Sequence, residues 1–183
     1  MGDLIIKPAS SGSLKIQDQA GTAHITTGTS SGLTLGSAVT FPAGHILRVI
    51  SVSKASNFST TETSFQTITG LTQAITPSSS SNKVFVMASF PLVESSGAAS
   101  GDAVSLGLFR DSTQIMEVVN LGYSNDNVVA TGVPMNILDS PGVDTEITYA
   151  AKIKSRTGST VQINPHGGGS LTIATLTLME IQG

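Results

Sequence analysis

Apolar and polar residues alternate along most of this chain. In the segment HILRVISVSKASNF, Ile46, Ile50 and Val52 fall on one parity, and Leu47 and Val49 fall on the other. A period of two predicts a β-strand, and apolar residues on both parities predict that this strand is well buried before it becomes polar. Apolar residues at helical spacing over a dozen positions are hard to find, so we expect almost no helix.

The same reading predicts a series of further strands. Lys83 begins the strongest apolar run, KVFVMASFPLV, and Pro91 is expected to end it or to make a bulge, because proline cannot donate to a ladder. The pair Asp111-Ser112 is expected to form a hairpin turn. Segments 95–102 and 123–131 are expected to be long polar loops, and 139–142 a tight turn. The other expected strands are 64–68 and 72–75 on either side of Gly70, 104–110, 114–119, 133–138, 146–154, 161–164 and 171–181.

The region before residue 44 differs in strand length and in glycine spacing. Very short strands, SLKI, AHIT, LTL and AVTF, are separated by glycines between Gly21 and Gly44. A ribbon of this kind is marginal in water, so it needs partners, and the simplest partners are copies of itself. We therefore expect residues 1–44 to form an N-terminal β stem or anchoring segment. Residues 45–183 are expected to form a head of roughly nine or ten strands, an antiparallel sandwich or jelly roll.

Composition narrows the function classes. Apolar residues make up 39% of the 183 residues, charged residues only 11% and aromatic residues 4%, and there is no cysteine. The apolar content is enough to form a core. The remaining residues are mostly Ser, Thr and Gly, which is typical of turn-rich β structure. A net charge of -3 disfavours nucleic-acid binding. We identify no signal peptide and no run long enough to span a membrane, so neither nucleic acid nor membrane is an expected partner.

Several segments resemble small virion proteins of tailed bacteriophages of marine bacteria. The matching pieces are FPAGHILRVISVS, TTETSFQTITGL, AITPSSSSNKVFVM, ILDSPGVDTEITYAAKIKSRTGSTVQIN and SLTIATLTLMEI, in this order over most of residues 41–181. The resemblance implies a trimeric jelly-roll head, similar in architecture to the C1q and tumour-necrosis-factor type, carried on phage fibres or capsid surfaces. The resemblance implies no binding residues. It also does not decide whether the protein is a tail fibre or a head decoration protein.

Two patterns point superficially to an esterase. Residues 28–32 read GTSSG, a G-x-S-x-G match around Ser30, and residues 166–169 read HGGG. A nucleophile elbow needs a strand before it and a helix after it. Here a short strand, LTL, follows, and the HGGG lies downstream of the serine. We therefore expect no catalytic residues and no enzyme.

The remaining candidate chemistry is sparse. His24, His45 and His166 stand singly, and only a trimer axis could gather copies of one of them, with His24 the candidate, into a metal site. The alternative is a histidine on a solvated strand face. We expect no metal, no cofactor and no site residues. The aspartates 102, 111, 126, 139 and 144 fall at loops or strand ends, where side-chain to backbone hydrogen bonds explain them.

One strand carries a basic face. Lys152, Lys154 and Arg156 share one parity, and Tyr149, Ala151 and Ile153 share the other. The basic face is read either as a contact for an acidic neighbour or a polyanionic glycan, or as an ordinary solvated face. Tyr123 and Tyr149 are the only tyrosines, and low aromatic content disfavours strong sugar stacking.

These observations predict a non-enzymatic phage virion surface protein, made in the bacterial host cytoplasm and displayed as a homotrimeric fibre or spike. Its expected partners are other copies of itself, capsid or tail proteins reached through the N-terminal segment, and a host surface glycan or protein. Two roles remain open. The protein is either a tail fibre or receptor-binding tip, or a head fibre or capsid decoration protein. The alternative is a lectin-like or hydrolytic module acting on host polysaccharide.

Overall fold

A computed structural model describes residues 15–17, 19–21, 23–27, 33–35, 41–96, 101–124, 128–165 and 172–183. The chain falls into two compact units, Met1–Pro42 and Ala43–Gly183. Each unit is described by itself.

The N-terminal unit contains three very short strands. They are β1 (Lys15–Gln17), β2 (Ala23–Thr27) and β3 (Leu33–Leu35), and they form one antiparallel sheet in the order β1-β2-β3. Gly21, with φ +84°, lies in the turn between β1 and β2. None of the side chains described in β1 and β2 is buried: Ile16 is 54% exposed, and Ile25 and Thr26 are intermediate. The fourth expected strand, AVTF, lies outside the described residues except for Phe41.

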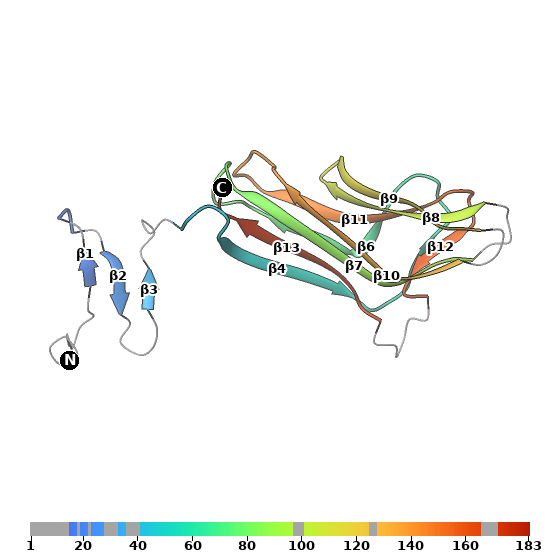
Figure 1. The fold of residues 1–183 in the computed structure, drawn as a ribbon, viewed down its shortest axis with the longest axis horizontal. Coiled ribbons are helices and arrows are strands. Elements are labelled where there is room, and N and C mark those ends of the chain that lie inside the picture. The colour runs from blue at the N-terminus through green and yellow to red at the C-terminus, as the bar shows by residue number, and fades with distance from the viewer. Residues whose placement is uncertain are drawn as a thin grey trace. The chain divides into compact units, whose positions relative to one another are not determined.

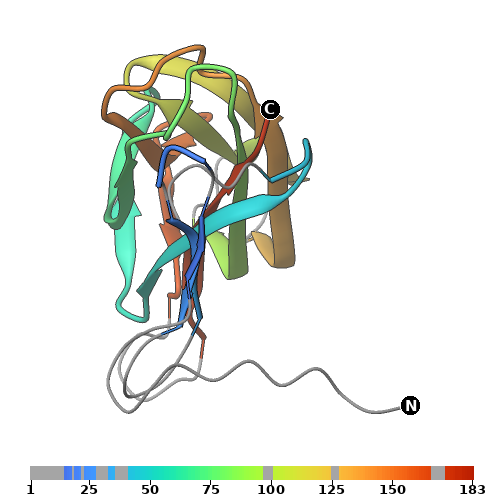
Figure 2. The same ribbon diagram turned by 90° about the vertical axis from the view of Figure 1, so that its left-hand side faces the viewer.

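The C-terminal unit is an antiparallel β-sandwich, which confirms the predicted all-β class. Figure 1 shows its strands stacked as two layers, and Figure 2 shows the same ribbon turned by 90°. No helix occurs among the residues described, and hence none that could cross a membrane. The strands are β4 (Ile46–Lys54), β5 (Phe58–Thr60), β6 (Gln66–Ile75), β7 (Lys83–Ser96), β8 (Asp102–Arg110), β9 (Thr113–Ser124), β10 (Val128–Asp139), β11 (Ile147–Ser155), β12 (Thr160–Ile163) and β13 (Ala174–Ile181).

The pairing of these strands gives a jelly roll. One sheet runs β4-β13-β7-β10, with β12 and β5 continuing beside the second half of β7. The other sheet runs β6-β11-β8-β9. Strands that are neighbours in sequence, such as β6 and β7, lie in different sheets, so the connections cross from one sheet to the other. Two sheets of four main strands joined in this way are the arrangement of a jelly roll.

The core lies between the two sheets because the inward positions of the strands are predominantly apolar. β13 shows this plainly, since every second residue from Ala174 onward is buried. A fully buried aliphatic or aromatic side chain stabilises the fold by about 1.5–3 kcal/mol relative to exposure. The largest fully buried side chains include Ile68, Leu71, Phe90, Leu106, Leu108, Met135, Tyr149, Ile153, Ile163, Leu176 and Leu178.

A buried carboxylate fastens one end of the sandwich. Glu180, at the end of β13, accepts hydrogen bonds at Oε1 from the backbone N of Ser78 (2.6 Å), the hydroxyl of Ser78 (2.7 Å) and Nδ2 of Asn82 (2.7 Å). Its Oε2 lies 3.3 Å from Nη2 of Arg48. Burial acts to raise the pKa of Glu180, but the hydrogen bonds and the Arg48 charge outweigh it and lower the pKa below 4.5. The carboxylate thereby ties β13 to β4 and to the loop before β7.

The prediction of two strands around Gly70 was wrong. β6 is one strand from Gln66 to Ile75, and Gly70 lies within it at φ +91°. Opposite it the register of β11 shifts between Ala150 and Lys152. Glycine here accommodates a bulge rather than a turn, since it reaches positive φ without steric cost.

Pro91 neither ends nor bulges its strand, contrary to expectation. β7 continues to Ser96, and its register with β10 is the same on both sides of Pro91. On its other side β7 pairs with β13 up to Ser89 and with β12 from Val93. Pro91 falls in the gap between these two neighbours, where a missing N–H interrupts no ladder.

Strands occupy part of both expected loops. Ser95 and Ser96 belong to β7, Asp102 begins β8, β9 reaches Ser124 and β10 begins at Val128. Residues 97–100 and 125–127 lie outside the described part of the chain.

Candidate functional site

The outer face of the sheet β6-β11-β8-β9 carries the basic residues of β11. Tyr149, Ala151 and Ile153 point into the core, as expected, while Lys152 and Lys154 alternate with them on the outer side. The outward positions therefore follow from the period of two that the sequence shows.

Two aromatic rings lie beneath these lysines. The rings of Phe65 and Phe109 meet edge to face, with centroids 5.2 Å apart and an interplanar angle of 69°. Nζ of Lys152 lies 4.1 Å from the Phe109 ring centroid, and Nζ of Lys154 lies 4.3 Å from that of Phe65. Both distances are within the range of cation–π attraction.

Gly107 makes room for this arrangement. It lies on β8 in register with Lys152 on one side and Glu117 on the other. A Cβ atom at this position would come within 2.8 Å of the Phe109 ring and 3.0 Å of the Phe65 ring. The absent side chain thus leaves space for the two rings.

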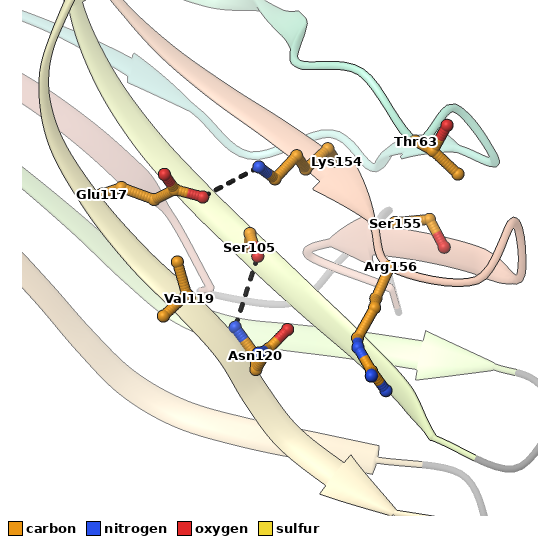
Figure 3. Close-up of a pocket in the computed structure, with 8 residues that line it drawn as sticks. All are labelled: Thr63, Ser105, Glu117, Val119, Asn120, Lys154, Ser155 and Arg156. Atoms are coloured by element: carbon orange, nitrogen blue, oxygen red, sulfur yellow. Dashed lines mark hydrogen bonds and ion pairs between the residues drawn. The ribbon is translucent and has the colours of Figure 1, made fainter.

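A polar hollow lies next to the rings, and Figure 3 shows it. Its volume is about 240 Å³, and its lining residues are Thr63, Ser105, Glu117, Val119, Asn120, Lys154, Ser155 and Arg156. We call this feature the polar hollow. It is formed by β8, β9, the end of β11 and the segment before β6.

Charge in the polar hollow is paired. Nζ of Lys154 lies 2.9 Å from Oε1 of Glu117, and this hydrogen bond is the main reason why the pKa of Glu117 is lowered, against a smaller opposing effect of burial. The backbone N of Asn120 donates to the Ser105 hydroxyl at 3.3 Å. Asn120 has φ +54°, a left-handed conformation at an irregularity in the β8–β9 pairing.

The residues that line the polar hollow offer several hydrogen-bonding groups. The lining residues include neither histidine nor cysteine, and a carboxylate with a lowered pKa, such as Glu117, is a weak general base. Hydroxyl, amide, ammonium and carboxylate groups close together suit a polar ligand. The sequence reading missed the polar hollow because its residues come from separate strands.

The predicted basic face is therefore not a row of unpartnered charges. Lys152 lies on an aromatic ring, Lys154 contacts Glu117, and Nη1 of Arg156, beyond the end of β11, donates to the Gly101 carbonyl at 2.7 Å. Both readings of this face, as a contact for an acidic neighbour or a polyanionic glycan and as a solvated face, stay predictions.

The outer face of the other sheet is apolar, which the sequence reading did not anticipate. Val49 pairs with Met179, Met179 with Phe85, and Phe85 with Leu138, so four outward side chains form one row across β4, β13, β7 and β10. Met87 extends the row along β7. We call these five residues the apolar face. The expectation that residues 46–54 are well buried was wrong on this side, because Val49 lies on the outer face of the sheet and is 54% exposed.

Several of the candidates predicted from the sequence lie outside the part of the chain that the structure describes. The GTSSG segment with Ser30, the HGGG segment with His166, and Asp126 lie outside the described residues, and the side chains of His24 and Tyr123 are likewise not described. His45 is exposed just before β4. Within the described part of the chain, no group of three or more His, Asp or Glu side chains is placed to hold a metal ion.

Asp111 and Asp102 have structural partners. Asp111 holds the β8–β9 turn, since its Oδ1 accepts from the Thr148 backbone N at 3.0 Å. Asp102 is buried and accepts from the hydroxyls of Thr157 and Ser159. Asp144 is exposed.

Asp139 connects three strands of the head. Its carboxylate accepts from Nη1 of Arg110 on β8 (2.8 Å) and from the hydroxyl of Tyr149 on β11 (2.6 Å). Burial, and then the Asp139 carboxylate, raise the pKa of Tyr149 above its ordinary value of 10.

Comparison with known proteins identifies no family. No family model matches the sequence, and no curated protein matches it. Among solved structures, similarity is found to the VP2 subviral particle of infectious bursal disease virus, with 15% identity and a TM-score of 0.35 over 74% of this chain and 38% of that one. A structure of the Gx strain of the same virus has 14% identity and a TM-score of 0.35 over 88% of this chain and 48% of that one. The chain thus spans less than half the length of these proteins, and a likeness of this degree does not bear on function.

Proposed function

We propose that the chain is a non-enzymatic virion surface structural protein that assembles as a homotrimeric fibre or spike. The observation that carries the proposal is the N-terminal sheet. Its strands are three to five residues long, and Ile16, its one described apolar side chain that is exposed, has more than half of its surface in solvent. Three such strands need an apolar face covered by something else to be stable, and stems of neighbouring copies supply that cover.

The head supports the same role. The jelly roll is an architecture of viral capsid and lectin domains, and its sequence resembles phage virion proteins over most of residues 41–181. Its stability comes from burial and internal hydrogen bonds, without a disulfide. The function is self-association and display, with the N-terminal segment attached to capsid or tail proteins.

Two experiments test the proposal. Light scattering on the purified full-length chain gives its mass in solution, and we expect three times the chain mass of 18.7 kDa. A monomer at micromolar concentration would contradict the trimer. Electron cryomicroscopy of intact particles then separates the two jobs, since density on the capsid lattice supports decoration and density at the tail periphery supports a receptor-binding fibre. Density at neither place would contradict a virion role.

The polar hollow favours a second candidate, a lectin-like module that binds neutral host polysaccharide. Glu117, Lys154 and Asn120 offer acceptors and donors suited to sugar hydroxyls. Binding of host polysaccharide to the wild-type chain, and its loss in Asn120→Ala with the mass unchanged, would support this candidate. Release of reducing sugar from the polysaccharide would instead support the hydrolytic reading.

A further inference from the structure

We infer that the apolar face is the contact through which the heads of neighbouring copies pack together. The inference rests on the proposed self-association and extends it from the stem to the head. Its occupant is a second copy of this chain.

The first observation is exposure that the fold does not require. Val49 is 54% exposed, Leu138 50% and Met87 40%, and they lie on three of the four strands of one sheet. The register aligns Val49 and Leu138 through Met179 and Phe85, so the exposed groups are contiguous rather than scattered. Contiguous exposed apolar surface marks an interaction site, whereas single exposed residues do not.

The second observation is the low cost of removing water from this face. Its polar neighbours are mainly hydroxyls, and Ser51 and Thr177 already pair with each other at 2.8 Å. On β13, β7 and β10, the charged residue among the described outward positions beside the row is Lys83. It is the first residue of β7. The outer face of the opposite sheet carries Lys152, Lys154 and Glu117, whose burial would cost far more.

The third observation identifies the occupant. The backbone N of Gly44 donates to the Gln182 carbonyl, and that of Gln182 to the His45 carbonyl, both at 2.8 Å. The chain arriving from the N-terminal unit is thereby fixed beside the ends of β4 and β13, next to the pair Ile46 and Ile181. Copies joined through their N-terminal units are held at millimolar effective concentration, so this face meets its counterpart before any other protein.

The size of the face fits a contact that works together with the stem. Strands lie about 4.8 Å apart and alternate residues about 6.8 Å apart. Four strands by three residue rows, which add the mainly Ser and Thr positions next to the apolar face, cover on the order of 400 Å². A stable interface buries about 800 Å² per partner, so the surface formed by these three rows covers about half of that area.

Single cysteines test the inference, because the chain contains none of its own. Val49→Cys and Leu138→Cys place a thiol on the apolar face. Val119→Cys is the matched control, since Val119 is 59% exposed on the outer side of the other sheet. The rate of maleimide labelling is measured on each full-length oligomer and divided by the rate in urea, which removes differences in intrinsic reactivity. Light scattering and circular dichroism on the same samples report assembly and folding.

We expect the normalised rates at Val49→Cys and Leu138→Cys to be about tenfold or more below that at Val119→Cys, the factor given by 1.4 kcal/mol of contact free energy. Equal rates in an oligomer of unchanged mass would overturn the head contact and leave the proposed function standing. A monomeric mass for the wild-type chain would overturn the proposed function and this inference with it.

Discussion

Replacing Glu180 with glutamine tests how the buried carboxylate stabilises the head. The substitution keeps the shape of the side chain and removes its charge. In the wild-type chain Oε1 accepts three hydrogen bonds, from the backbone and hydroxyl of Ser78 and from Asn82, at 2.6–2.7 Å. An amide oxygen can accept the same bonds, but as a neutral group.

The expected magnitude follows from those three bonds. A hydrogen bond to a charged group contributes about 1.5–3 kcal/mol, and neutral bonds are roughly half as strong. Each bond therefore loses about 1 kcal/mol, and we expect the free energy of unfolding to fall by about 3 kcal/mol at pH 7. We assign nothing to Arg48, because its side chain is 42% exposed and water can replace the contact.

The pH dependence gives an independent check. The pKa of Glu180 is lowered in the folded protein, so its stabilising effect is fully present above the ordinary value of 4.5 and is lost as the pH falls through the folded pKa. The difference between wild type and Glu180→Gln should therefore be constant near neutral pH and shrink in acid.

Urea unfolding at fixed protein concentration measures both effects, with Glu146→Gln as the control because Glu146 is exposed. Surface substitutions of this kind change stability by less than about 0.5 kcal/mol. The reasoning is refuted if Glu180→Gln destabilises no more than Glu146→Gln at pH 7, or if the difference is undiminished well below the folded pKa.

Two other substitutions test the outer and inner sides of the second sheet. Gly107→Ala should lower the free energy of unfolding by about 1–3 kcal/mol, because its Cβ meets the rings of Phe109 and Phe65. Adding Phe65→Leu to the same chain should restore part of this loss. If urea unfolding shows that the two substitutions change the free energy of unfolding additively, the contact is contradicted. Tyr149→Phe should cost about 1 kcal/mol, since the Asp139 carboxylate loses a buried donor. Because the pKa of Tyr149 is raised in the folded protein, its stabilising effect is complete below pH 10 and declines at higher pH. The difference in free energy of unfolding between wild type and Tyr149→Phe should therefore narrow in alkali. A difference that stays constant with pH would argue against this reasoning.

The sequence predicted the strands well, because alternation is a local signal. The two-residue turn at Asp111-Ser112 and the inward positions of β11 could be read directly from their own segments. Gly70 and Pro91 were misjudged because their effect depends on the neighbouring strand. Proline is harmless where β7 changes partners, and no local pattern reveals where that change occurs.

The surfaces could not be predicted for the same reason. The apolar residues of β4 indicated burial on both sides, although Val49, on the outward side, is exposed. The polar hollow gathers residues from 63 to 156, and its charge pair joins β11 to β9 across β8. Such features depend on register, which is set by pairing over long sequence distances.

The way the chain joins the head also determines how it bears a mechanical load. The N-terminal unit is attached at the start of β4, whose full length is hydrogen-bonded to β13, which is in turn bonded to β7. When the far end of the sandwich is held and the stem is pulled, tension runs along β4 and shears its ladder with β13. The hydrogen bonds of an antiparallel ladder lie across the strands, so they resist this force together rather than opening one after another. A head attached this way resists a pull along β4 better than peeling of β4 away from β13.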